Sequence, residues 1–267
     1  MKTPKNLLLL IAATLLMLIS ISHAHAGDFS FTTYTGYGIL KYEEKEDFSG
    51  KDYETKFKQK AIMLGFTGEY SFQRPKNFFL AGVTEFEFGL ENKEKSKENN
   101  AQFRTNDVRS FSQFYDMVFG YKNTYGIFHY KLYAVGGWDG LHFEREKVIS
   151  SGSTVPDSGN EDIKLWRTGV GTNIGFTASD WVFDGRLTYF YYPDGKTENS
   201  AVSQRTFDTT GDCVDMSLGT SRNVAKNLWL FLGGSYTMQE LKDNAESISW
   251  KSKFEILAGV ASLTYTF

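Results

Sequence analysis

The chain has little cysteine, little proline and, after residue 26, no long apolar run. Cys213 is the single cysteine of the 267 residues, so no disulfide can form within the chain. Past the N-terminal segment no stretch reaches the about 18 consecutive apolar residues of a membrane-spanning helix, which excludes helical spans. Only 4 prolines accompany 25 glycines, 15 tyrosines and 23 phenylalanines, a composition that fits long strands joined by turns.

An excess of basic charge and the common catalytic motifs are also missing. The formal net charge is −3, so a nucleic-acid partner is not expected. The sequence holds no Gly-x-Ser-x-Gly, no His-Glu-x-x-His and no cysteine cluster, which leaves serine-hydrolase and zinc chemistry without support. Past residue 26 only His129 and His142 offer an imidazole as a general base. We therefore predict no metal site and no cofactor.

The N-terminus has the order of charges and apolar residues that is typical of a secretory signal peptide. Lys2 and Lys5 precede an apolar run over residues 7–21, and Ala24-His25-Ala26 follows as an A-x-A cleavage site. We predict that residues 1–26 are removed and that residues 27–267 form one domain. The mature chain then carries 27 basic and 32 acidic residues, a net charge of −5.

The C-terminus predicts a strand that ends on an aromatic residue. Every second residue from Gly259 to Phe267 is apolar or small, and the residues between them are small or weakly polar. Nine further alternating segments precede it, so the ten expected strands cover about 29–41, 56–70, 77–90, 110–122, 126–142, 161–177, 181–192, 212–222, 227–239 and 251–267.

The connections between these segments alternate in length. Short ones fall at about 72–76, 123–125, 178–180 and 223–226, and long polar ones at about 42–55, 91–109, 143–161, 193–211 and 241–250. An even number of strands, with short turns on one side and long loops on the other, is typical of bacterial outer-membrane barrels. We predict an all-β, closed antiparallel transmembrane β-barrel of about ten strands, with short periplasmic turns and long extracellular loops.

The parity of each strand predicts which side chains face the lumen. Carboxylates and cations face lipid only at high cost, so the charged residues in the middle of strands should point inward. The expected luminal ion-pair network comprises Glu85, Glu87, Asp116, Lys131, Arg167, Asp184, Arg186 and Asp215, joined by His129 and Asp139. Ten strands enclose a bore that side chains can largely fill, so an ion channel, the further alternative, would be narrow.

A secreted ten-stranded barrel that closes on Leu-Thr-Tyr-Thr-Phe resembles the omptin family of outer-membrane proteases. Locally the likeness is carried by residues 168–192, with a tight turn at Ser179-Asp180 before Trp181-Val182-Phe183, and by residues 254–267. The resemblance implies a water activated by an acidic pair on one side of the mouth and an Asp-x-His pair opposite. It also implies cleavage beside basic residues and a requirement for lipopolysaccharide.

The residues at the mouth depart from that signature. Asp194-Gly195-Lys196 places a lysine where the family has histidine, and a protonated lysine cannot act as the base. The second loop begins Glu91-Asn92-Lys93 without an Asp-x-Asp pair. We therefore expect a monomeric outer-membrane barrel with a structural or binding role, adhesin-like or ligand-contacting. Its expected partners are outer-membrane lipid, lipopolysaccharide and an extracellular ligand.

The alternative is a diverged omptin-like protease or other hydrolase. Its candidate catalytic residues are Asp139, His142, Asp194 and Glu91. Strict alternation puts Asp139 and His142 on opposite faces of one strand, so they could pair only across a bulge or a bend.

Overall fold

The computed structural model describes residues 27–48, 51–99, 101–150, 153–154, 159–199, 205–243 and 249–267. The predicted signal peptide, residues 1–26, lies outside the described residues. None of the described residues forms a helix long and apolar enough to cross a membrane. The elements are β1 (Gly27–Phe48), β2 (Lys51–Phe72), β3 (Phe78–Glu98), β4 (Ala101–Tyr125), β5 (Phe128–Ser150), β6 (Ser153–Thr154), β7 (Gly159–Ala178), β8 (Trp181–Asn199), β9 (Arg205–Ala225), β10 (Leu228–Asp243) and β11 (Ser249–Thr266).

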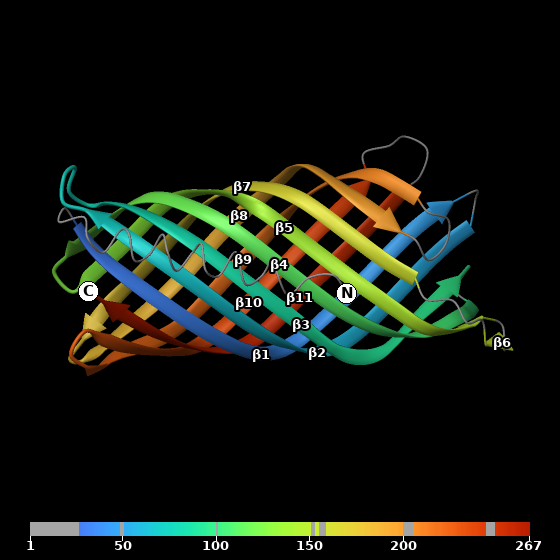
Figure 1. Cartoon of the computed structure of the whole chain (residues 1–267), viewed down its shortest axis with the longest axis horizontal. Coiled ribbons are helices and arrows are strands. Elements are labelled where there is room, and N and C mark those ends of the chain that lie inside the picture. The colour runs from blue at the N-terminus through green and yellow to red at the C-terminus, as the bar shows by residue number, and fades with distance from the viewer. Residues whose placement is uncertain are drawn as a thin grey trace, which may run out of the picture.

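Ten long strands close into one antiparallel barrel, as predicted (Figure 1). Each strand pairs with the next along the chain, and the two-residue β6 extends the edge of β5. The ring is completed by β1 and β11, paired from Ser30↔Thr266 to Asp47↔Ser249. The C-terminal strand thus closes the wall against the first strand, and every long strand has two partners, which leaves no free edge.

The turns at the end of the barrel that carries Phe267 are short, also as predicted. The β7–β8 and β4–β5 turns at this end are examples. Ser179, with a φ of 57°, connects β7 to β8 in a two-residue turn, and Gly126, with a φ of 60°, does the same between β4 and β5. Two-residue hairpins need a left-handed residue, because its backbone twist matches that of the paired strands.

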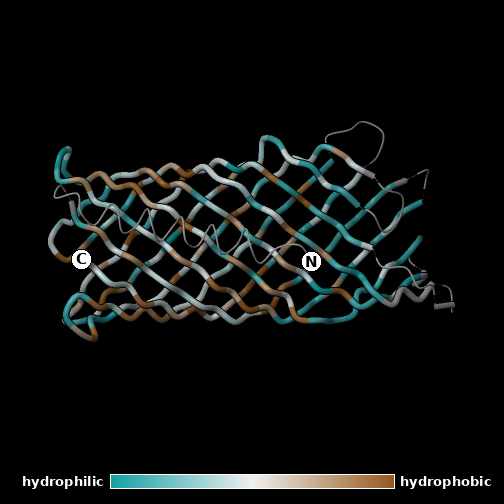
Figure 2. The backbone as a smooth tube through the Cα atoms, viewed as in Figure 1, coloured by the Kyte–Doolittle hydropathy of each residue, from teal (hydrophilic) through white to brown (hydrophobic). Residues whose placement is uncertain are grey.

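The strands at the opposite end are much longer than predicted. Most of the residues expected in long loops, including 42–48, 91–98 and 193–199, continue as paired strand. Strands of 16 to 25 residues far exceed the about 9–11 residues that cross a bilayer. The barrel therefore projects well beyond the membrane as a rim, which Figure 2 shows as a hydrophilic end opposite Phe267.

The polarity of the wall inverts where the rim begins. Nearer the short turns the outer surface is an apolar belt, and the luminal face is polar. In the rim, Phe143 points inward and is fully buried while its neighbour Glu144 points outward. The belt includes Leu64, Phe66, Leu80, Met117, Phe119, Leu132, Ile174, Leu187, Leu218, Leu232 and Leu263, all at least 37% exposed.

Inward apolar side chains fill the rim. The ring of Phe143 lies 4.9 Å from that of Tyr42, 5.8 Å from Phe57 and 6.4 Å from Phe254. We call this packed layer the rim core; it comprises Leu40, Tyr42, Phe57, Val108, Leu141, Phe143, Ile163, Leu165, Leu241, Trp250, Phe254 and Ile256, none more than 6% exposed. The inverted pattern explains the missed strand residues: outside the bilayer, alternation places charged residues outward and apolar residues inward, as in a water-soluble barrel.

Candidate functional site

A cavity of about 510 Å³ occupies the lumen inside the apolar belt. All eight residues of the expected luminal network line it, together with His129 and Asp139. Arg186, on β8, is 44% exposed at its side chain and Lys131, on β5, is 34% exposed, so solvent reaches the cavity. The rim core closes the lumen on the other side, so the cavity is approached from the end that carries the short turns.

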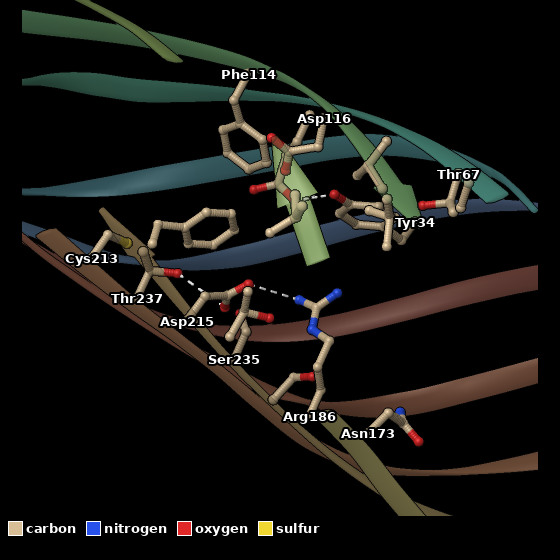
Figure 3. Close-up of a pocket in the computed structure, with 18 of the residues that line it drawn as sticks. Tyr34, Thr67, Phe114, Asp116, Asn173, Arg186, Cys213, Asp215, Ser235 and Thr237 are labelled. Atoms are coloured by element: carbon tan, nitrogen blue, oxygen red, sulfur yellow. Dashed lines mark hydrogen bonds and ion pairs between the residues drawn. The ribbon is translucent and has the colours of Figure 1, made fainter. Parts of the chain in front are cut away.

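Several ion pairs line the cavity wall, and Arg167 takes part in two of them, with Asp116 and, at 3.8 Å, with Asp139. Arg167 binds Asp116 with two hydrogen bonds, Nε to Oδ1 at 2.8 Å and Nη2 to Oδ2 at 2.6 Å. Its guanidinium also lies between two aromatic rings, 4.3 Å from Phe114 and 4.4 Å from Phe190. Arg186 Nη2 donates to Asp215 Oδ2 at 3.0 Å, as Figure 3 shows. This part of the wall is rigid, because bidentate and stacked guanidinium groups have little freedom to move.

Three further ion pairs lie nearer the short turns. His129 Nε2 contacts Asp184 Oδ1 at 2.6 Å. Lys131 and Lys122 both bind the carboxylate of Glu69, at 2.5 Å and 2.7 Å. The sequence does not predict Glu69 or Lys122 as members of the network. Close to a turn most residues of a strand are polar, so alternation does not indicate which of them face the lumen.

Two carboxylates of the network have no cation partner. Glu85 accepts a hydrogen bond from the Tyr34 hydroxyl, and Glu87 accepts one from Ser112. Among the described residues no Lys, Arg or His nitrogen lies within 4.0 Å of either carboxylate, although Glu85 is only 7% and Glu87 only 5% exposed. The network is therefore a set of ion pairs plus two adjacent buried acids.

The four candidate catalytic residues do not meet in one site. Asp139 is buried in the lumen, where Tyr192 and Gln239 each donate to its Oδ2 at 3.1 Å. His142 faces outward and its Nδ1 contacts Asp162 Oδ1 at 2.8 Å. The other two also lie on the outer wall, after bulges that shift the parity of their strands: Glu91 pairs with Arg109 at 2.6 Å, and Asp194 is exposed. Lys196 shares the outward face with Asp194.

A second charged cluster is buried in the rim. Arg145 donates from Nε to Glu94 Oε2 and from Nη1 to Glu161 Oε2, both at 2.8 Å, and all three side chains are at most 4% exposed. Glu44 accepts a 2.6 Å hydrogen bond from the Trp250 indole. Burial, reinforced by the nearby charge of Glu161, raises the pKa of Glu44 to about 8. The pattern that marks this cluster is a charged residue at an inward position between apolar ones.

The outer surface of the rim divides by charge. Eleven lysines face outward over β10, β11, β1, β2 and β3, and we call this face the basic wall: Lys41, Lys45, Lys56, Lys58, Lys60, Lys93, Lys95, Lys97, Lys242, Lys251 and Lys253. Seven outward acidic residues lie among them: Glu43, Asp47, Asp52, Glu54, Glu91, Glu240 and Glu255. The opposite face is mainly acidic, with Asp107, Glu144, Glu146, Asp162, Asp194, Glu198, Asp208 and Asp212.

Comparison with solved structures identifies the architecture. The outer membrane protease OmpT from Escherichia coli aligns with a TM-score of 0.66 at 11% identity, over 90% of this chain and 97% of that chain. The fold is that of an omptin barrel. At this identity the likeness shows the fold alone.

Two other bacterial barrels are less similar to this chain. The translocator domain of autotransporter NalP from Neisseria meningitidis aligns with a TM-score of 0.41 at 12% identity, covering 96% of this chain and 95% of that chain. The outer membrane protein OprG from Pseudomonas aeruginosa has a TM-score of 0.32 at 12% identity, over 91% and 96%. No protein-family model and no curated protein sequence matches this chain.

Proposed function

We propose that the protein is an integral barrel of the bacterial outer membrane with a binding role, and that its basic wall holds the phosphate groups of lipopolysaccharide. The observation that carries the proposal is the position of the lysines, which begin where the apolar belt ends. On β2 the outward residues run from Leu64 and Ile62 directly to Lys60, Lys58 and Lys56. Lipid phosphates lie at this level, just outside the hydrocarbon.

Strand register brings the lysines of neighbouring strands side by side. Lys41 pairs with Lys58, Lys56 with Lys95, and Lys45 with Lys251. Adjacent strands are about 4.8 Å apart, so the paired lysines repel one another. An anion bound between them would reduce this repulsion. A Lys or Arg near an anionic membrane surface contributes about 1 kcal/mol. Several acting together would give stable binding even though Glu43 and Glu255 neutralise part of the charge.

The alternatives of a hydrolase and an ion channel receive less support. The four candidate catalytic side chains point to different sides of the wall, which gives no shared position for a substrate or a water. The rim core lies across the lumen between the cavity and the outside, and a continuous aqueous path would have to pass through it. The extracellular ligand of an adhesin-like role would meet the rim, whose two charged faces offer the contact surface.

The test compares matched lysine variants in defined lipid. The triple variant Lys56→Gln, Lys58→Gln, Lys95→Gln removes adjacent charges of the basic wall. The control Lys164→Gln, Lys196→Gln removes outward lysines from β7 and β8, on the acidic face. We expect the triple variant to retain at least about tenfold less bisphosphorylated lipid A on purification, measured by native mass spectrometry. Equal retention by the triple variant, the control and the parent protein would refute the proposal.

A further inference from the structure

The middle of the luminal cavity holds more carboxyl groups than cations. Five carboxylates, from Glu85, Glu87, Asp116, Asp139 and Asp215, line it together with the two guanidinium groups of Arg167 and Arg186. Asp116 and Asp215 take one arginine each, as their hydrogen bonds show. An ionised carboxylate without a partner is costly in a lumen enclosed by lipid, so a bound cation would stabilise the ionised form of the acids that have no cation partner.

The uncompensated acids are adjacent. Glu85 and Glu87 are two residues apart on the same face of β3, which places their Cα atoms about 7 Å from each other. The hydroxyl of Tyr34 donates to Glu85 and that of Ser112 donates to Glu87, and each carboxylate can accept further hydrogen bonds. Arg186 lies within electrostatic range of Glu85, but its hydrogen bond goes to Asp215.

A second, independent observation points to a ligand in this space. Ser235, on β10, lines the cavity and is 9% exposed, yet its hydroxyl has no hydrogen-bond partner among the described residues. Figure 3 shows Ser235 beside Asp215 on the wall of the cavity. Buried polar groups are nearly always hydrogen-bonded, so an unpaired hydroxyl aimed into a cavity marks a position for a polar ligand group.

The shape and lining of the cavity favour an organic cation over a metal ion. No group of three His, Cys, Asp or Glu side chains in the described part of the chain is arranged to hold a metal ion. The volume of about 510 Å³ is in the range of small-molecule sites, and the aromatic rings of Tyr34 and Tyr133 line it, beside Phe114 and Phe190, which stack on Arg167. Aromatic faces and carboxylates together are the groups that bind organic ammonium ions.

We propose that the cavity is a binding site for a small organic amine in its ammonium form, which enters from the side of the short turns. One ammonium group lies between Glu85 and Glu87, and the hydroxyl of Ser235 accepts a hydrogen bond from a second polar group of the ligand. The rim core closes the other end of the site. This site is independent of the basic wall, because none of the eleven outward lysines lines the cavity.

The experiment is calorimetric titration of the refolded full-length mature barrel in zwitterionic detergent free of lipopolysaccharide. The probe is 1,4-diaminobutane, and the neutral isostere 1,4-butanediol is the matched control ligand. We expect saturable binding of the diamine and none of the diol. Glu87→Gln should weaken the affinity at least about tenfold, and Ser235→Ala should weaken it less. The control variant Glu240→Gln, which removes an exposed carboxylate from the outer wall of β10, should leave it unchanged.

A stability measurement separates a binding role of the acids from a purely structural one. With no ligand present, Glu87→Gln removes an uncompensated charge and should unfold at the same or a higher urea concentration than the parent protein. Absence of saturable diamine binding to the parent protein would overturn the proposal. So would equal binding of the diol, or an unchanged affinity in Glu87→Gln. If Glu87→Gln fails to fold, as judged by gel mobility before and after boiling, the diol comparison and Ser235→Ala decide.

Discussion

Arg145 and Glu161 form an ion pair at 2.8 Å inside the rim, where the arginine is 4% exposed and the glutamate fully buried. Glu94 occupies the other side of the same guanidinium, also at 2.8 Å. Burial alone would lower the pKa of Arg145, but Glu94 and Glu161 outweigh it and hold that pKa well above its usual value. The cation therefore stays charged, and it joins β3, β5 and β7 at a level of the barrel that is outside the membrane.

Replacing Arg145 by Met should strongly destabilise the barrel. The substitution leaves two carboxylates buried without a cation, which typically costs about 3–5 kcal/mol. The measurement is the free energy of unfolding in urea from lipid vesicles. The control is Arg109→Met, which breaks the exposed pair with Glu91 and should cost less than about 1 kcal/mol. Equal losses in the two variants would contradict the assignment of Arg145 as a buried connector.

The stability of the rim should fall as the pH rises through the range in which Glu44 titrates. The pKa of Glu44 is about 8 in the folded barrel, against an ordinary value of 4.5 for a solvated glutamate. Between these values the folded state holds a proton that the unfolded state releases, so the free energy of unfolding decreases with increasing pH. Below the lower value the contribution is fully present, and above about 8 it is lost. Glu44→Gln should show a flatter dependence on pH than the parent protein between these limits; identical slopes would contradict this.

The rim core should respond to truncation like the interior of a soluble protein. Phe143 is fully buried among three aromatic rings, so Phe143→Ala should cost about 3–5 kcal/mol. The control is Phe66→Ala on the belt, where lipid can fill the space that the ring leaves.

In planar bilayers we expect no conductance steps from the parent protein. Regular steps from the parent protein would show that the rim core is not closed.

The boundary between belt and rim should be visible in an arginine scan. Leu132→Arg places a charge on the outward face in the belt and should destabilise the barrel by about 2–4 kcal/mol. Glu144→Arg, on the outward face of the same strand in the rim, should change the free energy of unfolding by less than about 1 kcal/mol. A similar cost at both positions would place residue 144 in the hydrocarbon, against the structure.

The fold could be predicted from the sequence because alternation and turn spacing are local signals. Trp181 to Tyr191 alternate with Asp184 and Arg186, and this contrast alone identifies the lipid-facing and luminal sides. The rim was not predicted because its outward residues, such as Lys93 and Lys95, are charged, and polar stretches of this kind are also typical of loops. The run Lys93-x-Lys95-x-Lys97 has the same period of two as the wall and indicates that the strand continues.

The site was predictable only in part. Parity placed Glu85, Glu87 and Arg167 on the luminal face, but pairing across the lumen depends on the register of strands far apart in the sequence. Two bulges determine the orientation of Glu91 and Asp194. One after Gly89 turns Glu91 outward, and one after Tyr192 turns Asp194 outward, because each extra residue reverses the parity of the strand beyond it.

The inversion of polarity also fixes how deep the barrel lies in the bilayer. If the barrel sank toward the side of the short turns by one outward residue on each strand, lysines such as Lys60 would enter hydrocarbon. If it rose by the same amount, the aromatic residues near the turns, such as Phe267, would leave the interface that suits them. Either displacement is opposed around the whole circumference at once. The polarity pattern of the wall therefore fixes the depth of insertion and keeps the rim at a constant height above the membrane surface.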